Sequence, residues 1–482
     1  MSAAEAQYSH PQIQTEIAQS DAILESLSEL RAKLLTQLEE TELRIKRESA
    51  RRGRLANLLA PISLPPELLS TIFLICQDTT QSFPIIASHV CGYWRDVATS
   101  TPLLWANVRL RLSIRTSREV LDTQTDRLEA YLTRTNTSHF KVRVEINGNH
   151  DFSKIVECVA AHSDRCSHFH LSLANNPYAV ETLRGCFASV EAPVLEHLSI
   201  TVSPLMGHYD PRQFSIILPT VFASAPSLTF VRLTGVAGSL QPPLVNVTTL
   251  HVDGVHMSDL TLPQYRRLLA GLPSLVNLSL LEIGVIEPGI ESLDPIPLPF
   301  LRSLRLRDGL DYQSVRLLLD SLPVEQIESL ILSHVEQLDP SLFPNVRQLT
   351  FSACNFPVDQ LGHIMLAFPS VQSFTIEIIS SLMLIALGYP GTPVWWPHLK
   401  ILTVREIQHV EINSLLELVR NRKKMEHPLE KVYLDKRSKG LLRGRSQLEE
   451  LESMVSVERH HDTEAWPAGL GYEDEDDGFW LP

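Results

Sequence analysis

Cysteine and long apolar runs are both scarce in this chain, and each scarcity excludes a class of protein. Six cysteines stand among 482 residues without the spacing of a disulfide framework, which favours a reducing compartment. The most apolar run, residues 378–387, is far shorter than the ~20 residues that span a bilayer. No charged and then apolar leader opens the chain. We therefore expect a cytoplasmic or nuclear protein with no membrane partner.

Positive charge and enzyme motifs are also in short supply. The chain has 42 basic and 56 acidic residues, a net charge of -14. Nucleic-acid binding requires a basic surface, so we expect no nucleic acid among the partners. The sequence contains no phosphate loop, dinucleotide fingerprint, GxSxG elbow or HExxH helix. We expect no catalytic residues, no cofactor and hence no enzyme.

Two clusters resemble metal sites but have the wrong spacing. In the first, the two cysteines are eight residues apart, whereas zinc sites usually separate them by two to four. The second resembles the start of a calcium loop, but its twelfth position would be residue 484, beyond Pro482. We therefore expect no metal and interpret residues 441–482 as an acidic tail that ends in the aromatic pair Phe479-Trp480. The clusters are Cys158, His162, Cys166, His168 and His170, and Glu473, Glu475 and Asp477.

After a disordered N-terminus (1–13), residues 14–60 predict one long helix. Proline and glycine are missing from residues 14–52, and strong helix formers dominate there. A heptad seam is broken by Arg31, Thr41, Glu48 and Arg52. It therefore leaves two interpretations open, namely a coiled coil that forms a homodimer through residues 14–59, or a helix folded back on the chain. The seam consists of Ile17, Leu24, Leu27, Leu34, Leu38, Ile45, Leu55 and Leu59.

Residues 64–108 predict two short amphipathic helices. Pro65-Pro66 suits the first turn of a helix, where the missing N–H would have no partner anyway. Four apolar residues then recur at helical spacing, and a second set follows after a polar break at residues 77–82. The first set is Leu68, Leu69, Ile72 and Phe73; the second, on one side of a single helix, is Ile86, Val90, Cys91, Trp94, Val97 and Ala98.

These motifs resemble the F-box, so residues 61–115 are expected to form that module. The tail at residues 100–105 resembles the extended form common in mushroom-forming fungi. The resemblance implies binding to a Skp-type adaptor, and through it to a cullin, in a ubiquitin ligase complex. It departs at Gly92, where a glycine inside a helix costs about 1 kcal/mol and would weaken the second helix. The implied adaptor-binding residues are Leu64, Pro65, Leu68, Ile72, Phe73, Val90, Cys91 and Trp94.

Beyond this module an apolar-x-x-apolar-x-apolar pattern occurs ten times. From Leu195 to Leu429 nine steps cover 234 residues, a mean period of 26. Alternating residues predict a strand in each copy, with helical or irregular segments between the strands. Two weaker copies precede these, at Val142-Val144 and Cys166-Phe169-Leu171. The copies begin at Leu195, Leu228, Val247, Leu275, Leu301, Ile327, Val346, Val371, Leu399 and Leu429.

The pattern resembles leucine-rich repeats, whose period is about 20 to 29 residues. The resemblance covers residues 137–436 and implies an α/β fold, in which an irregular solenoid (116–440) has a parallel sheet and helical returns. It departs where the family places a polar ladder of Asn or Cys, because only Cys354 matches that ladder. The other positions are apolar, at Val236, Val255, Ile283, Val335, Ile379 and Ile407.

A solenoid sheet of this kind would expose one concave face, which repeat proteins use for binding. Arg305 and Arg307 are expected to project from one strand, with Arg232 and Arg405 on other repeats. Guanidinium groups suit carboxylate or phosphate, so we expect an acidic or phosphorylated target protein. The expected function is substrate recognition in a Skp–cullin–F-box ubiquitin ligase. The alternative is a scaffold that uses the repeats and the coiled coil without a ligase role.

Overall fold

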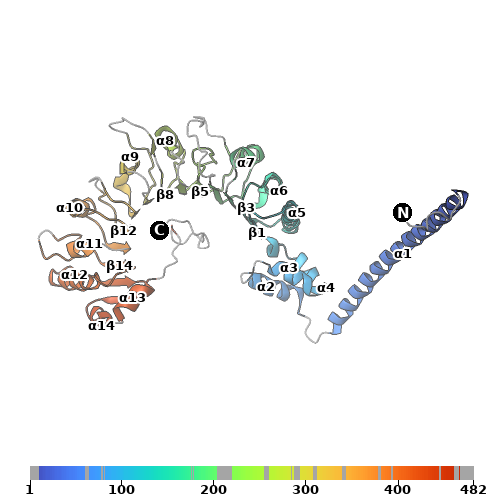
Figure 1. Cartoon of the computed structure of the whole chain (residues 1–482). Helices are drawn as coiled ribbons and strands as arrows, with labels where there is room; N and C mark the ends of the chain where they lie inside the picture. Colours follow the sequence, from blue (N-terminus) through green and yellow to red (C-terminus); the bar gives the residue numbers. More distant parts are fainter. Residues whose placement is uncertain are drawn as a thin grey trace, which may run out of the picture. The chain divides into compact units, whose positions relative to one another are not determined.

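The chain divides into two units, residues 1–105 and 106–482, shown in the computed structural model in Figure 1. Each unit is described by itself. The structure describes residues 10–59, 64–77, 80, 82–174, 176, 178–203, 220–254, 260–283, 285–286, 294–307, 312–338, 343–377, 381–391, 394–443, 447–460 and 466.

The first unit begins with the predicted long helix, α1 (His10–Leu59), which has 50 residues. The apolar side chains of the predicted seam are exposed where the structure describes them. Leu24, for example, is 63% exposed and Leu38 is 55% exposed. The long helix is confirmed.

A small helical module follows, built from α2 (Pro66–Gln77), α3 (Phe83–Val90), α4 (Gly92–Thr99) and the 3-10 turn η1 (Pro102–Trp105). The prediction of one helix through the second apolar set is wrong. The chain breaks at Cys91, whose backbone is extended (φ −159°, ψ 172°). The Cys91 sulfur accepts a hydrogen bond from the backbone N–H of Trp94 at 3.5 Å and so caps α4. Gly92 is then the first residue of α4, so the predicted weakening by a glycine inside a helix does not occur.

Aromatic packing holds the module together. The Phe73 ring lies 5.7 Å from that of Phe83 and 5.0 Å from that of Trp94, between centroids. The Trp105 indole is buried and donates a hydrogen bond to the Ala98 carbonyl at 2.8 Å, so its polar atom is satisfied. Three helices from distant parts of the segment thus share one core.

The second unit contains one 14-stranded sheet whose neighbouring strands are parallel and follow the chain order, apart from β7 and β9. Figure 1 shows this sheet on the inner side of a curve and the helices on its outer side. The strands are β1 (Asn107–Leu112), β2 (Phe140–Asn147), β3 (Cys166–Ala174), β4 (His197–Ser203), β5 (Phe230–Thr234), β6 (Thr249–Asp253), β8 (Asn277–Leu281), β10 (Ser303–Arg307), β11 (Ser329–Ser333), β12 (Gln348–Ser352), β13 (Ser373–Glu377), β14 (Ile401–Arg405), β15 (Lys431–Leu434) and β16 (Ser456–Arg459).

Helical returns connect these strands, as the pattern predicted. Two short strands form a separate sheet with each other. They are β7 (Leu260–Thr261), between β6 and β8 in the chain, and β9 (Val285–Ile286), between β8 and β10. The helices are α5 (Arg118–Arg134), α6 (Ser153–Ala160), α7 (Ala179–Phe187), α8 (Leu262–Ala270), α9 (Tyr312–Asp320), α10 (Val358–Ala367), α11 (Ser381–Leu387), α12 (Ile412–Lys424), α13 (Lys436–Arg443) and α14 (Gln447–Glu452), with 3-10 turns η2 (Ser163–Arg165) and η4 (Val324–Gln326).

All ten strong copies and both weaker copies of the repeat pattern are strands, but the predicted boundaries are too narrow. The sheet begins at β1, inside the segment assigned to the F-box (61–115), because Val108, Leu110 and Leu112 alternate with polar residues and pair with β2. It ends at β16, inside the segment assigned to the tail (441–482), where β16 pairs with β15. The fold is therefore a solenoid-like parallel sheet with helical returns.

A recurrent turn stands where the polar ladder was expected. The residue directly after the strand has a positive φ in five repeats, and its N–H donates a hydrogen bond to the following repeat. Glu282 N–H, for example, donates to the Arg307 carbonyl at 3.0 Å. The apolar residue that follows then enters the core, as Val335 and Ile407 do. The positive-φ residues are Gly235, Glu282, His334, Ala353 and Glu406.

Candidate functional site

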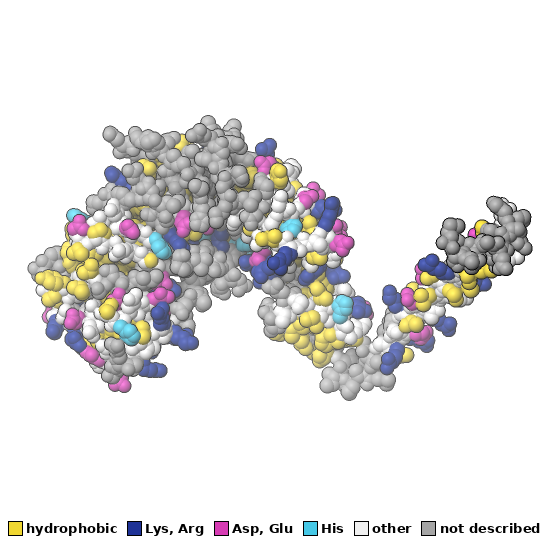
Figure 2. Space-filling view, in the orientation of Figure 1, with side chains coloured by type: hydrophobic (Ala, Val, Ile, Leu, Met, Phe, Trp, Pro, Cys, Tyr) yellow, Lys and Arg dark blue, Asp and Glu magenta, His cyan; other side chains and the backbone are white. Residues whose placement is uncertain are grey.

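The helical module of the first unit has an uncovered apolar surface, visible in Figure 2. On α2, Leu69 and Phe73 enter the core, whereas Leu68, Ile72 and Ile75 form a second stripe at helical spacing and are exposed. Leu68 is 54% exposed and Ile75 is 65% exposed. A helix that is apolar on two sides normally has a partner on each of them, so this stripe is a candidate protein interface.

The eight predicted adaptor-binding residues divide between this surface and the core. Pro65, Leu68, Ile72 and Val90 are exposed, and Leu64, Cys91 and Trp94 are half-buried. Phe73 is fully buried between Phe83 and Trp94, so its side chain supports the module and does not reach a partner. The sequence prediction missed three exposed apolar residues, although the first continues the spacing of Leu68 by seven positions. These are Ile75, Ile86 and Leu103.

The inner face of the sheet carries side chains in rows across the strands. The central row is defined here by the register Arg232, His251, Ser279, Arg305, Ile331, Thr350, Thr375 and Thr403. Two predicted target-binding arginines, Arg232 and Arg305, share this row three strands apart. The other two, Arg307 and Arg405, share the next row four strands apart. The four arginines therefore do not form one cluster.

From β4 to β10 the central residues of the strands are buried on both faces, unlike those of β11, β12 and β13. Rings from adjacent strands stack across the inner face, with His168 and His197 at 5.5 Å, His197 and Phe230 at 4.2 Å, and Phe230 and His251 at 5.0 Å. The Arg232 guanidinium lies 5.7 Å from the centre of the Phe230 ring. This stack was not predicted, because each ring comes from a different repeat.

Arg305 is at the centre of this face and is only 2% exposed. Its Nε donates to the Ser279 hydroxyl at 3.0 Å, and one terminal nitrogen lies 3.5 Å from His251 Nδ1. The indole of Trp466, a residue 161 positions later in the chain, lies over the guanidinium at 4.8 Å from ring centre to Cζ. Trp466 also contacts the His251 ring at 5.4 Å between centroids. The side chain predicted to capture a target is thus already covered.

Burial lowers the pKa of His251 well below its usual 6.5, and the nearby charges of Arg232 and Arg305 and the His197 ring act in the same direction. The neutral imidazole can accept the Arg305 hydrogen bond at Nδ1. Its Nε2 is buried and has no hydrogen-bond partner among the described residues. The face therefore presents a fixed guanidinium beside a neutral ring.

Arg307 and Arg405 have carboxylate partners within the fold. Arg307 Nε lies 3.6 Å from Glu282, and Arg405 lies 3.5 Å from Glu377. Glu377 also accepts a hydrogen bond from the Ser352 hydroxyl at 2.9 Å. Both arginines thus have a structural role in the sheet, which any target-binding role would have to share.

The inner face from β11 to β14 is different in character. Its central row holds Ile331 on β11 and threonines on β12, β13 and β14. A surface groove of about 500 Å³ runs along the starting ends of β10–β14. Charges of both signs line the groove. Arg302 pairs with Glu328 at 3.5 Å, and Lys400 pairs with Glu430 at 2.8 Å. Such pairs compensate one another and select no particular ligand charge.

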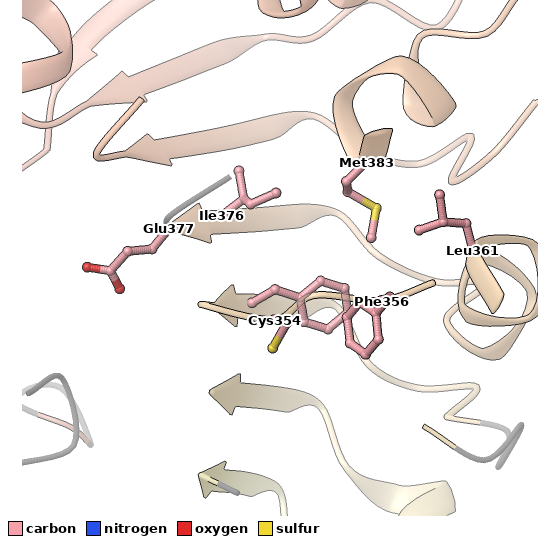
Figure 3. A pocket seen from close by; sticks show the side chains of 7 residues that line it. Cys354, Phe356, Leu361, Ile376, Glu377 and Met383 are labelled. Carbon is pink, nitrogen blue, oxygen red and sulfur yellow. The ribbon is translucent and has the colours of Figure 1, made fainter. Parts of the chain in front are cut away.

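A second hollow lies inside the solenoid, between β12, β13 and the helices beside them (Figure 3). Phe356, Leu361, Ile376 and Met383 surround it, and the Glu377 carboxylate points away. Its volume is about 10 Å³, which is room for at most one water molecule. We interpret it as a packing gap.

Of the two clusters whose spacing resembles metal sites, the first shares His168 with the ring stack on the inner face, and the second lies outside the described residues. Burial raises the pKa of Cys158 to about 11 and that of Cys166 to about 12, which disfavours the thiolate that binds metals. The described residues bring together no group of three or more His, Cys, Asp or Glu side chains suited to a metal ion. Residues 473–477, 479 and 480 lie outside the described part of the chain.

Neither the known protein-family models nor the curated proteins include a match to this chain. Among the described helices, none has both the length and the apolar character of a membrane span.

Proposed function

We propose that this chain is a substrate-recognition subunit of a Skp–cullin–F-box ubiquitin ligase. In this proposal the helical module of residues 64–105 binds the adaptor, and the inner face of the solenoid binds a target protein. The chain itself catalyses no reaction and needs no cofactor; its contribution is to bring a target to an enzyme.

The observation that carries the proposal is the uncovered apolar stripe on α2. The Leu68, Ile72 and Ile75 side chains remain exposed although a complete core exists on the other side of the same helix. Uncovered apolar side chains grouped on one stripe usually mark a protein interface. Leu68 and Ile72 of this stripe are among the residues that resemble the F-box motif, which supports an adaptor as the partner.

A pull-down with purified Skp-type adaptor tests this proposal. The double variant Leu68→Asp, Ile72→Asp should lower adaptor affinity at least tenfold, since a buried interface residue often contributes ~2 kcal/mol or more. The control variant Thr99→Asp, Ser100→Asp introduces the same charges at exposed polar positions at the end of α4 and should bind normally. Equal adaptor binding by both variants, with unchanged helix content, would contradict the ligase role.

The exposed seam of α1 favours the alternative, or an additional, function as a scaffold that dimerises. Leu27, Leu30, Leu34, Leu35 and Leu38 line one apolar groove along the helix. A homodimer through residues 14–59 would bury this groove. The variant Leu27→Glu, Leu34→Glu should therefore be monomeric by light scattering, whereas Ser28→Glu, Thr36→Glu should behave like the wild type. A monomeric wild type at tens of micromolar would exclude a dimer of ordinary strength.

A further inference from the structure

Trp466 packs on the inner face of the sheet, against Arg305 and His251. Its indole is half-buried and stacks on Arg305, and the edge of the contact is formed by His251 at an interplanar angle of 63°. Aromatic and cationic groups from distant segments meet here within one unit. The contact joins the β6–β10 region to a residue beyond β16.

The surface beneath the indole is held in place by its own hydrogen bonds and stacking. Arg305 donates to Ser279, and His251 packs against Phe230, which in turn stacks on His197. A guanidinium that is already held in place beneath an aromatic ring loses little freedom when the ring binds, so the cation–π contact contributes more than it would at a mobile side chain.

We propose that Phe230, Arg232, His251, Ser279 and Arg305 form a binding site for an indole next to carboxylates, that Trp466 occupies this site as an internal ligand, and that a target must displace it. Displacement of Trp466 by a target rests on the proposed receptor function, whereas the site and its occupation by Trp466 do not. The sequence predicted an acidic target segment, and this site adds a tryptophan to that segment as the residue that anchors it.

The sequence around Trp466 has the charge that this site favours. Asp462 and Glu464 stand four and two residues before it, and no basic residue follows it. Arg232 and Arg305 on the site, with Arg307 in the next row, supply positive charge. A ligand from another protein would accordingly carry a tryptophan within a few residues of two carboxylates.

The curvature of the sheet makes the internal contact attainable. Trp466 comes seven residues after Arg459, the end of β16, so the connection reaches at most about 25 Å. Six strand spacings separate β16 from β10 in the sheet order, or about 29 Å along a flat sheet. The short connection also gives Trp466 an effective concentration on the order of millimolar, which an external ligand must overcome.

The test uses full-length protein and a synthetic peptide of residues 460–472, with its Trp466→Ala form as the control peptide. The chain variant Trp466→Ala should bind the peptide at least tenfold more tightly than the wild type, because its site is vacant. The variant Trp480→Ala, which removes another tryptophan from the same tail, should bind like the wild type. Adding Arg305→Met to Trp466→Ala should reduce binding at least tenfold, whereas adding Arg316→Glu on α9 should not.

Two results would overturn the proposal: equal peptide affinity in the Trp466→Ala and wild-type chains, or equal affinity for the two peptides. If Trp466→Ala does not fold, the wild-type chain labelled with 5-fluorotryptophan gives the same information. Its Trp466 fluorine resonance, assigned with Trp466→Phe, should move when the peptide is added in excess and in the Arg305→Met chain; no movement in either case refutes the site.

Adaptor pull-down on the same variants separates this inference from the proposed function. Trp466→Ala and Arg305→Met change only the second unit and should retain adaptor binding. Peptide binding without adaptor binding refutes the ligase role and keeps the site. Adaptor binding without peptide binding refutes the site and keeps the ligase role.

Discussion

The inner face of one continuous sheet has two halves of opposite character. From β4 to β10 it carries rings and arginines and is largely buried, whereas from β11 to β14 it carries hydroxyl groups and compensated charges. The backbone register is the same throughout, so the difference is one of side chains alone. A solenoid can therefore confine a binding site to a few repeats without changing its fold.

The largest expected difference between the halves concerns Phe230 and Gln348, which occupy the same row of the register. Phe230→Ala removes a fully buried ring and should lower the free energy of unfolding by about 3–5 kcal/mol. Gln348→Ala, at an exposed position, should change it by less than about 0.5 kcal/mol. Urea denaturation measures both, and equal effects would abolish the distinction between the halves.

Glycine substitution provides the second contrast. Gly235 has φ +70°, and a Cβ there would lie 2.2 Å from the Val202 carbonyl oxygen, so Gly235→Ala should cost roughly 2–3 kcal/mol. Gly362, within α10, has open space around its Cβ position, and Gly362→Ala should stabilise by up to about 1 kcal/mol. Thermal unfolding that shifts in the same direction for both would show that the Val202 contact relaxes freely.

The third contrast is in pH dependence. Burial, Arg232, Arg305 and His197 lower the pKa of His251 in the folded chain. Below pH 6.5 the unfolded chain therefore binds a proton at His251, whereas the folded chain binds it only at a lower pH. Stability should therefore fall as the pH drops from 7 to 5, by at most about 1.4 kcal/mol per pH unit from this site.

Removing His251 tests the assignment of that slope. His251→Gln should flatten the decline, and His363→Gln, an exposed histidine on α10, serves as the matched control. The free energy of unfolding of the wild type and of both variants is measured at pH 7, 6 and 5. An unchanged slope in His251→Gln would mean that other groups cause the acid sensitivity.

The smallest contrast is between two ion pairs. Arg307–Glu282 is mostly buried, whereas both side chains of Lys400–Glu430 are more than half exposed. Lys400→Met should cost less than about 0.5 kcal/mol, and Arg307→Met should cost clearly more because it leaves Glu282 without its partner. Double-mutant cycles with Glu430→Gln and Glu282→Gln measure the coupling in each pair. A larger coupling for Lys400 would reverse the expected order.

The sequence by itself determined the repeat and its strands. Apolar periodicity is a short-range signal that each copy carries alone, so all ten strong copies could be located without contacts between them. The same signal located α1 and the helical module. It failed at β1 and β16, where a single alternating segment stands next to other motifs and no neighbouring copy reinforces it.

Only the tertiary structure decided which predicted side chains are available. Phe73 and Ile72 are adjacent in one apolar helix, and packing against Phe83 and Trp94 buries the first and leaves the second exposed. Arg422, part of a basic run, is buried and donates to the carbonyls of Trp395, Trp396 and His427.

Arg305 shows the same limit most clearly, because its ring partner stands 161 residues away. Residue type and local spacing predicted that Arg305 faces the inner side of the sheet. They could not predict that Trp466 covers it, since this contact depends on the curvature that the whole set of repeats creates together.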